Sequence, residues 1–539
     1  MTMLVSSTAR PSLEGERFEV VVIGGGINGS AIARECARGG KRVLLVEKND
    51  FACGTTSRST RIIHGGLRYL EHGELSLVRE SLRERERLLH SKGHLVRPLH
   101  FLLAMPEESN RSALEVRFGL WLYRKFARRS AVNDVKEDRA RLERLLDRGH
   151  TWSVFAYEDA QCEYPERLVI EWTLAAASLG AVVRNHTQAL NIHCSDGQVT
   201  GVWLRDLLTQ EEFRVHTECV INATGPWADF MLQDSGIKTD EPLVGGVRGS
   251  HIVLPIFDGA PNAAVYTEAV DGRPIFIIPW AGQLLVGTTE VKDTGNPDCV
   301  APDAGEIDYL LNSFKRLFPS INYGLSDIRS TFAGVRPLPY ITEQSPNSIT
   351  RRHFLADHKE DGARGMISVI GGKLTTAASL ARECARAIGI NIPEPKGFAI
   401  SDTVAFQPPA FDQLAASLQV NKDSLRTIAT TFNGAAASIF SLAAKDDSFR
   451  QSICPHTKHL VAEAVYAITN EYAATLGDVL LRRVPVALGP CWSQECARTA
   501  AHRIGKALGW NEAKIGAELN AFEEEFGSFM LKPAAAAKG

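Results

Sequence analysis

The 539-residue sequence predicts an α/β protein in which a parallel sheet is combined with an antiparallel sheet, followed by an all-α C-terminal part. Three observations lead to this prediction. Residues 18–47 show the strand, glycine-rich turn, helix and strand pattern of a βαβ unit. Between residues 247 and 290 the apolar residues recur with the period of strands. Beyond residue 400 helical patterns dominate to the end.

The composition indicates an ordinary globular protein of two or three packed units. Hydrophobic residues make up 44% and charged residues 23%, and the net charge of -3 gives no overall attraction to nucleic acid or anionic lipid. The N-terminus lacks the apolar core of a secretory signal, and no run of about eighteen apolar residues occurs. We therefore expect a protein that is neither secreted nor membrane-spanning.

The ten cysteines are scattered, without a C-x-x-C pair or a Cys/His cluster of zinc-site spacing. Cys491 and Cys496 are the closest pair. We expect buried, reduced thiols and no metal.

The first glycine-rich turn has the G-x-G-x-x-G spacing of a dinucleotide site. Gly24 permits the tight turn, Gly26 lets the backbone approach a pyrophosphate, and Gly29 lets the helix pack on the strand. Glu47 ends the second strand, where a carboxylate accepts hydrogen bonds from ribose hydroxyls. Since an acidic side chain disfavours a 2′-phosphate, FAD or NAD fits better than NADP.

Residues 50–74 form a predicted loop rich in Ser, Thr and Gly, with His64, Arg68 and Tyr69 near its end. The loop begins directly after the ribose-binding strand, so its N–H groups and hydroxyls can reach the same ligand. The alternative is a simple surface loop.

Residues 112–129 predict a helix with Leu114, Phe118, Trp121, Leu122 and Phe126 on one face, and with arginines elsewhere. An aromatic, basic amphipathic helix can lie in a membrane interface. A helix that packs on the core with a basic outer side is the equal alternative on this pattern alone.

Two further segments place flexible backbone beside the expected cofactor. A buried strand within residues 218–229 runs into Ala223, Thr224 and Gly225, a feature that favours FAD over NAD. A second strand, glycine turn and helix occupies residues 365–389, where the helix N-terminus can bring positive potential to a phosphate or to a reduced flavin. Arg336 is expected at a strand end between these two segments.

Several of these stretches, taken in order, closely resemble the FAD-dependent glycerol-3-phosphate dehydrogenases. They are GGGINGSAIAREC, TTSRSTRIIHGGLRYLEHGE, INATGPWAD, GSHIVLP, IPWAGQLLVGTTE, FAGVRPLPY and IGGKLTT, with AEAVYAITNEYAATLGDVLLRRV in the C-terminal third. The resemblance covers roughly residues 18–528, and the segments IHGGLRYLE and GVRPL make it specific. The chain has no acidic calcium loops, so it resembles the bacterial form. It also has no long insertion of the kind found in oxygen-using glycerophosphate oxidases.

Two local departures from the family pattern occur. Pro165 and Glu166 stand where the family has an acidic pair, and Thr60 and Arg61 stand where Ser-Lys is common. Neither departure affects the ligands carried over below.

The resemblance implies a glutathione-reductase-like FAD-binding domain interleaved with an antiparallel β substrate domain, plus a C-terminal all-α domain. The expected division is a disordered N-terminus at 1–17, an FAD-dependent oxidoreductase region at 18–398, a helical domain at 399–531 and a tail at 532–539. Within the oxidoreductase region, the FAD-binding segments are about 18–100, 150–230 and 330–398. The substrate or cap segments are about 101–149 and 231–329.

The expected FAD ligands come from the two glycine turns and the segments around them. They are Gly24, Gly26, Ile27, Asn28, Gly29, Glu47, Lys48, Thr55, Thr56, Ser57, His64, Gly65, Gly66, Leu67, Ala189, Thr224, Gly225, Trp227, Gly372, Leu374, Thr375 and Thr376.

The implied reaction oxidises sn-glycerol 3-phosphate to dihydroxyacetone phosphate, with hydride transfer to FAD and electrons passed to a quinone. We expect Arg68, Tyr69, Arg336 and Lys373 to bind the substrate. His251, Arg336 and Lys373 are the expected catalytic residues. A histidine that titrates near neutral pH suits a general base, although a structural role for His251 is the favoured alternative. His64 is expected to position the FAD loop.

Two other enzyme classes remain open at this point. An amino-acid or amine oxidase of the same fold would bind a carboxylate with one arginine and offer an apolar pocket. A tRNA-modifying flavoprotein would show a broad basic surface. A non-catalytic binding module is disfavoured because cofactor and chemistry both look complete. For partners and location, the resemblance implies peripheral contact with the inner face of the cell membrane, no nucleic acid and a possible homodimer.

Overall fold

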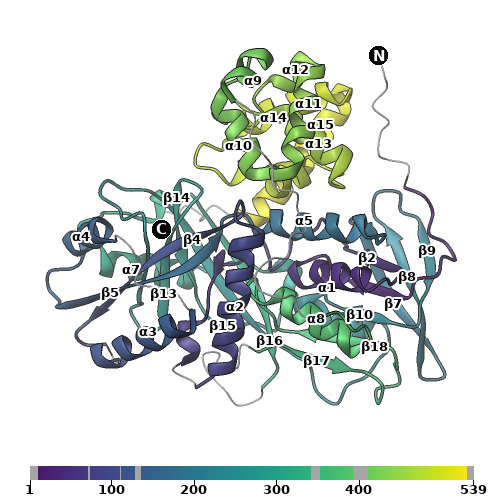
Figure 1. The fold of residues 1–539 in the computed structure, drawn as a ribbon, viewed down its shortest axis with the longest axis horizontal. Coiled ribbons are helices and arrows are strands. Elements are labelled where there is room, and N and C mark those ends of the chain that lie inside the picture. Colours follow the sequence, from purple (N-terminus) through teal and green to yellow (C-terminus); the bar gives the residue numbers. More distant parts are fainter. Residues whose placement is uncertain are drawn as a thin grey trace, which may run out of the picture.

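The structure is a computed structural model, shown in Figure 1. It describes residues 10–70, 73–109, 111–127, 135–341, 352–393 and 411–530. The side chain of Arg68, the expected tail at 532–539 and residues 394–410, where the two expected domains join, lie outside this description.

A six-stranded sheet forms the centre of the first domain, with the order β17-β18-β10-β1-β2-β6. All neighbours are parallel except β17 and β18. The strands are β1 (Val20–Ile23), β2 (Val43–Val46), β6 (Val182–Arg184), β10 (Val220–Asn222), β17 (Phe354–Asp357) and β18 (Met366–Ile370).

Both faces of this sheet are covered, which explains the continuous apolar runs of its strands. On one face, Val20 and Val22 pack with the helices α1 (Ile27–Arg38), α5 (Pro165–Ser178) and α8 (Ala377–Ala387). On the other face, Val21 and Ile23 pack against a three-stranded sheet. That sheet contains β7 (Thr187–Ser195), β8 (Gln198–Asp206) and β9 (Glu212–His216).

A second, mainly antiparallel sheet has the order β15-β11-β14-β13-β12-β4-β5-β3, with β16 paired to β11. Its strands are β3 (Ile62–Ile63), β4 (Val96–Pro106), β5 (Trp152–Cys162), β11 (Val244–Pro255), β12 (Ala264–Glu268), β13 (Pro274–Trp280), β14 (Gln283–Gly287), β15 (Val291–Lys292) and β16 (Ser330–Pro339). β5 and β16 fall inside segments that the sequence assigned to the FAD-binding part, yet both pair into this sheet.

Helices cover the outer parts of the second sheet and connect it to the first domain. They are η1 (Leu67–Leu70), α2 (Leu75–Ser91), α3 (Ala113–Ala127), α4 (Lys136–Leu145), η2 (Gly225–Trp227), α6 (Ala228–Asp234), η3 (Pro297–Cys299), α7 (Ala304–Leu317) and η4 (Leu325–Asp327).

The expected disorder of the N-terminus is wrong for residues 10–17. Leu13 is buried in the core beside the three-stranded sheet. Arg10 donates hydrogen bonds to the backbone and side-chain oxygens of Asn185, at 2.6 and 2.8 Å. The expectation missed these contacts because their partners lie far along the chain. Residues 1–9 lie outside the described residues.

Helix α3 turns part of its aromatic face outward, so a core role is wrong for that part, whereas Phe126 packs against the core. Leu114, Phe118 and Trp121 are 75%, 63% and 49% exposed, whereas Leu120 and Tyr123 are the buried residues.

The C-terminal part is a helical domain that stands above the junction of the two sheets (Figure 1). It contains α9 (Phe411–Leu418), α10 (Lys422–Phe432), η5 (Asn433–Ala435), α11 (Ala436–Lys445), α12 (Asp447–Arg450), α13 (Val461–Asn470), η6 (Asp478–Arg483), η7 (Val486–Leu488), α14 (Gln494–Ala507) and α15 (Glu512–Phe529).

One stretch of this domain, Lys422–Lys445, is long and apolar enough to cross a membrane by length and composition. It consists of two helices separated by the turn at η5. Leu425, Ile428 and Ile439 within it are fully buried in the domain core. We therefore interpret the stretch as part of the core of the helical domain.

Buried ion pairs join the helical domain to the first domain. Asp50 receives hydrogen bonds from Arg483, at 2.6 and 2.8 Å, and from Arg482. Arg482 also pairs with Asp478 at 3.0 Å, and Asp478 pairs with His186 at 2.9 Å. We call Asp50, His186, Asp478, Arg482 and Arg483 the junction network.

Candidate functional site

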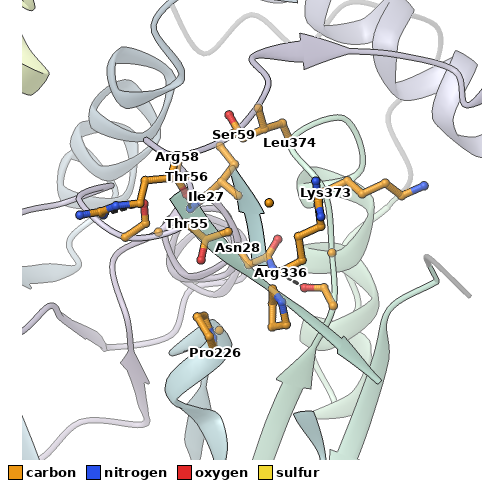
Figure 2. Close-up of a pocket in the computed structure, with 18 of the residues that line it drawn as sticks. Ile27, Asn28, Thr55, Thr56, Arg58, Ser59, Pro226, Arg336, Lys373 and Leu374 are labelled. Atoms are coloured by element: carbon orange, nitrogen blue, oxygen red, sulfur yellow. Dashed lines mark hydrogen bonds between the residues drawn. The ribbon is translucent and has the colours of Figure 1, made fainter. Parts of the chain in front are cut away.

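A cavity of about 700 Å³ lies between the carboxyl ends of the parallel strands and the second sheet. Figure 2 shows Arg336, Lys373 and Asn28 on one side of it, and Thr55, Thr56 and Arg58 on the other. The carboxyl edge of a parallel sheet is where nucleotide cofactors bind in α/β folds.

The two glycine turns meet at the middle of the cavity. Gly24 has a φ of 106°, and a Cβ there would lie 2.6 Å from the carbonyl oxygen of Ala223. A Cβ on Gly372 would lie 2.5 Å from the amide nitrogen of Asn28, which donates a hydrogen bond to the Gly371 carbonyl at 3.1 Å. Side chains are thus excluded where backbone must approach a pyrophosphate.

Glu47 lies at one end of the cavity, at the end of β2. Its carboxylate accepts hydrogen bonds from the backbone N–H of Gly25 at 2.7 Å and of Asn49 at 3.0 Å. Burial raises the pKa of Glu47, although these two N–H groups act in the opposite direction. Nearby, the ammonium of Lys48 lies 4.6 Å from the ring centroid of Trp227 and pairs with Asp298 at 2.6 Å. This end has the carboxylate and the flat ring that an adenosine requires.

The opposite end of the cavity is cationic. Arg336, on β16, donates hydrogen bonds to the Thr288 hydroxyl at 3.0 Å and the Thr289 carbonyl at 3.3 Å. The ammonium of Lys373 lies 4.1 Å from the ring centroid of Tyr69. A Cβ on Gly249 would lie 2.5 Å from the Arg336 guanidinium, so this glycine makes room for it. The pair forms a site suited to a small dianion.

His251 lies beside this cationic end, in β11. Its Nε2 forms a 3.0 Å hydrogen bond with the Thr60 hydroxyl, and its ring stacks on Phe332. Burial, followed by the nearby charges of Arg336 and Arg61, lowers the pKa of His251 to about 3. The expectation that His251 titrates near neutral pH is therefore wrong for this structure, and the ring is neutral.

The pKa of His64 is lowered in the same way as that of His251. Burial, followed by the charges of Lys373 and Arg85, lowers its pKa to about 3. The next residue, Gly65, donates its N–H to the Tyr123 hydroxyl at 2.8 Å and to the Asp159 carboxylate at 3.1 Å. These contacts fix the position of the turn that carries His64.

Most of the expected FAD ligands line the cavity. They are Gly24, Gly26, Ile27, Asn28, Glu47, Lys48, Thr55, Thr56, His64, Gly66, Leu67, Ala189, Thr224, Gly225, Trp227, Gly372, Leu374 and Thr375. Tyr69, His251, Arg336 and Lys373 line it as well.

Four expected ligands, Gly29, Ser57, Gly65 and Thr376, are absent from the wall of the cavity. Ser57, for example, donates its hydroxyl to the Ala52 carbonyl at 2.7 Å. The side chain of Arg68 lies outside the described part of the chain, so its expected role stays a prediction.

The sequence reasoning missed several lining residues. Arg58 lines the cavity from the loop after β2, with its guanidinium over the ring of Phe529. Tyr266 and Phe276 stack on each other near the cationic end, with ring centroids 4.8 Å apart. Arg58 stands in a serine- and threonine-rich loop already suspected of binding, but the two aromatics alternate like ordinary core residues and carried no signal.

The residues present fit FAD. Among the described residues, Asn28 Oδ1, Trp227 Nε1 and His251 Nδ1 are buried without a hydrogen-bond partner, and all three residues line the cavity. Buried polar atoms normally have partners, so a ligand that supplies them is expected here. Glu47 would hold the ribose, the two glycine turns the pyrophosphate, and the cationic end the flavin and the substrate.

Comparison with known proteins gives consistent results. A family model described as FAD dependent oxidoreductase matches residues 19–378, and the model of the C-terminal domain of alpha-glycerophosphate oxidase matches residues 399–515. A glycerol-3-phosphate dehydrogenase of Synechocystis sp. is 37% identical over 501 residues, which are 89% of this chain and 90% of that protein. A D-erythritol 1-phosphate dehydrogenase of Brucella abortus is 37% identical over 380 residues, 68% of this chain and 73% of that protein.

Among solved structures, the glycerol-3-phosphate dehydrogenase from Bacillus halodurans complexed with FAD aligns over 96% of both chains. The TM-score is 0.73 at 23% sequence identity. At this identity the likeness shows a shared fold.

Proposed function

Since the chain belongs to the FAD-dependent oxidoreductase family, among the glycerol-3-phosphate dehydrogenases, we propose that it oxidises sn-glycerol 3-phosphate to dihydroxyacetone phosphate. The proposal includes hydride transfer to FAD and delivery of the electrons to a quinone. The observation that carries it is the cationic end of the cavity, where Arg336 and Lys373 lie beside the neutral His251.

The phosphate needs charge complementarity, which the planar fork of Arg336 and the ammonium of Lys373 supply. The C2 hydroxyl must lose a proton as its hydrogen leaves as hydride. If Nε2 of His251 donates to the Thr60 hydroxyl, Nδ1 is left as a proton acceptor. Lys373 stabilises the negative charge that develops on the substrate oxygen. Bound FAD supplies the hydride acceptor.

The test is anaerobic mixing of the yellow holoenzyme with sn-glycerol 3-phosphate while the flavin absorbance is followed. We expect bleaching by this substrate, no bleaching by glycerol, and recovery when a soluble quinone is added. A flavin that stays oxidised with this substrate would refute the proposed activity. A reduced flavin that recovers with oxygen and not with the quinone would refute the acceptor alone.

A second candidate substrate is a longer polyol phosphate, because the D-erythritol 1-phosphate dehydrogenase has the same 37% identity as the glycerol-3-phosphate dehydrogenase, although over 380 residues instead of 501. The same anaerobic assay with D-erythritol 1-phosphate separates the two by their rates of flavin reduction. An amino-acid oxidase is disfavoured because the cationic end carries two basic side chains where one carboxylate would require one.

We also propose that the protein binds the inner surface of the cell membrane through α3. Leu114, Phe118 and Trp121 form an exposed apolar face, and the ammonium of Lys125 lies 4.2 Å from the Trp121 ring centroid. Such a face with basic neighbours is typical of helices that lie in a membrane interface. We expect co-sedimentation with anionic lipid vesicles that is lost in the double variant Phe118→Ser, Trp121→Ser. Unchanged binding of this variant would refute the role of α3.

A further inference from the structure

A group of cysteine and histidine side chains lies in the helical domain, away from the cavity. Cys454 and His456 belong to the loop between α12 and α13, and Cys496 lies in the first turn of α14. The ligand atoms of these three residues all lie within 4.8 Å of one another, and His456 Nδ1 is 3.4 Å from Cys496 Sγ. His456 and Cys496 are 40 positions apart in the sequence, so only the fold brings them together.

We propose that Cys454, His456 and Cys496 bind a zinc ion, with Cys491 as the fourth ligand. Thiolate and imidazole are the ligands of structural zinc sites, and three cysteines with one histidine is a common set. Zinc–ligand distances of about 2.3 Å to sulfur and about 2.0 Å to nitrogen place tetrahedral ligands about 3.5–3.8 Å apart. The observed separation between His456 Nδ1 and Cys496 Sγ is close to this value.

Cys491 lies beside this group, and its backbone carbonyl is 3.5 Å from Cys496 Sγ. Its thiol is not among the ligand atoms that lie within 4.8 Å of one another, so zinc binding requires this side chain to turn toward the other three. Cys491 and His456 are exposed while Cys454 and Cys496 are buried. The site therefore opens to solvent on one side, which gives an ion a path of entry.

Zinc at this position would fasten the α12–α13 loop to the segment that enters α14. That segment contacts the second sheet directly: Gln283 donates to the Leu488 carbonyl at 3.0 Å, and Arg329 donates to the Pro490 carbonyl at 2.7 Å. The ion would thus hold the segment through which the helical domain docks on the sheet.

The first test measures zinc by elemental analysis of the FAD-loaded full-length protein after gel filtration in metal-free buffer. We expect about one zinc ion per chain, in line with a single four-ligand site. In the Cys454→Ser and Cys496→Ser variants we expect at least a tenfold lower content. Cys299→Ser, a substitution at an exposed cysteine, and His502→Gln, at an exposed histidine on α14, are matched controls that should keep the ion.

A second measurement covers the case in which the cysteine variants do not fold. Cobalt replaces zinc in unmodified protein, and tetrahedral cobalt with thiolate ligands absorbs in the red, beyond the oxidised flavin. Appearance of this band, and its loss on adding zinc, would support the site. Folded protein without zinc and without the cobalt band would overturn the proposal, as would a disulfide between any two of the three cysteines found by mass spectrometry.

Discussion

Buried histidines have opposite pKa shifts at the cationic end of the cavity and in the junction network. His251 and His64 line the cavity, and burial next to cations lowers the pKa of each to about 3. His186 is also largely buried, but its carboxylate partner Asp478 outweighs burial and raises its pKa. The same residue type is neutral in one region and stabilised as a cation in the other.

The difference follows from the charges that lie next to each histidine. In the junction network the carboxylates of Asp50 and Asp478 meet two guanidinium groups and one imidazole. Glu525, which pairs with Arg482, supplies the third carboxylate, so the charges are neutralised within the protein. At the cavity end Arg336 and Lys373 lie near two histidines whose pKa is lowered, and Glu74 and Glu290 also line the cavity. The histidine of the junction is held as a cation by a carboxylate, whereas the histidines of the cavity lie next to cations.

The largest effect is expected from breaking the junction. Asp50→Asn leaves Arg482 and Arg483 buried without their shared carboxylate, and such a loss destabilises by about 3–5 kcal/mol. Denaturant unfolding of the FAD-loaded enzyme measures this decrease in the free energy of unfolding. Glu19→Gln, which removes an exposed partner of Lys41, should leave the midpoint unchanged. An unchanged midpoint for Asp50→Asn would mean that the network contributes no stability.

Removal of charge from the cavity end should impair activity instead of stability. For Arg336→Met we expect kcat/KM for glycerol 3-phosphate to fall by about 10²–10³, the equivalent of about 3–4 kcal/mol of lost transition-state binding. The denaturation midpoint should stay about equal, because Arg336 is only half-buried. Arg17→Met, at an exposed position, controls for the lost charge. A lowered midpoint would show that Arg336 stabilises the fold, as the junction arginines do.

The lowered pKa of His251 predicts an acid-dependent loss of stability. The unfolded chain takes up a proton below about pH 6.5, and the folded state does not until about pH 3. Stability is therefore full above pH 6.5 and falls as the pH drops, by about 2 kcal/mol at pH 5 for this group. The His251→Asn variant should lose less stability between pH 7 and pH 5, measured by unfolding at each pH. If the stability of the variant and of the unmodified enzyme changed equally with pH, the lowered pKa of His251 would be contradicted.

The smallest effect has the opposite sign and arises at His186. Its raised pKa means that the stabilisation is full below about pH 6.5 and is lost as the pH rises through the raised value. His186→Gln should remove about 1 kcal/mol or less at pH 6, and the difference from the unmodified enzyme should shrink toward pH 9. A difference that grows with pH would show that Asp478 does not hold His186 as a cation.

Local pattern was sufficient for the elements that bind the cofactor. The spacing of Gly24, Gly26 and Gly29 predicts the first turn, because each glycine stands where a local steric constraint excludes a side chain. The strand, glycines and helix near Gly372 follow the same logic. Both turns line or support the cavity, and the parallel order of β1, β2 and β10 agrees with the βαβ reading.

Features that depend on distant pairing could not be predicted. β16 pairs with β11 across more than sixty residues of chain, and the pKa of His251 depends on Arg336, which that pairing brings close. The outward face of α3 was ambiguous because a helical period marks one face without saying what covers it. The cysteines at 454 and 496 meet through tertiary packing alone, so sequence spacing gave no sign of this cluster.

The junction network also has a consequence for the order in which the chain is made. Asp50 leaves the ribosome more than four hundred residues before Arg482 and Arg483, so its buried position cannot be neutralised while most of the protein is being translated. Translation at about 5–20 residues per second makes this delay tens of seconds. During that interval the loop after β2, which contributes residues to the nucleotide site, lacks the arginines that pair with Asp50 in the folded protein.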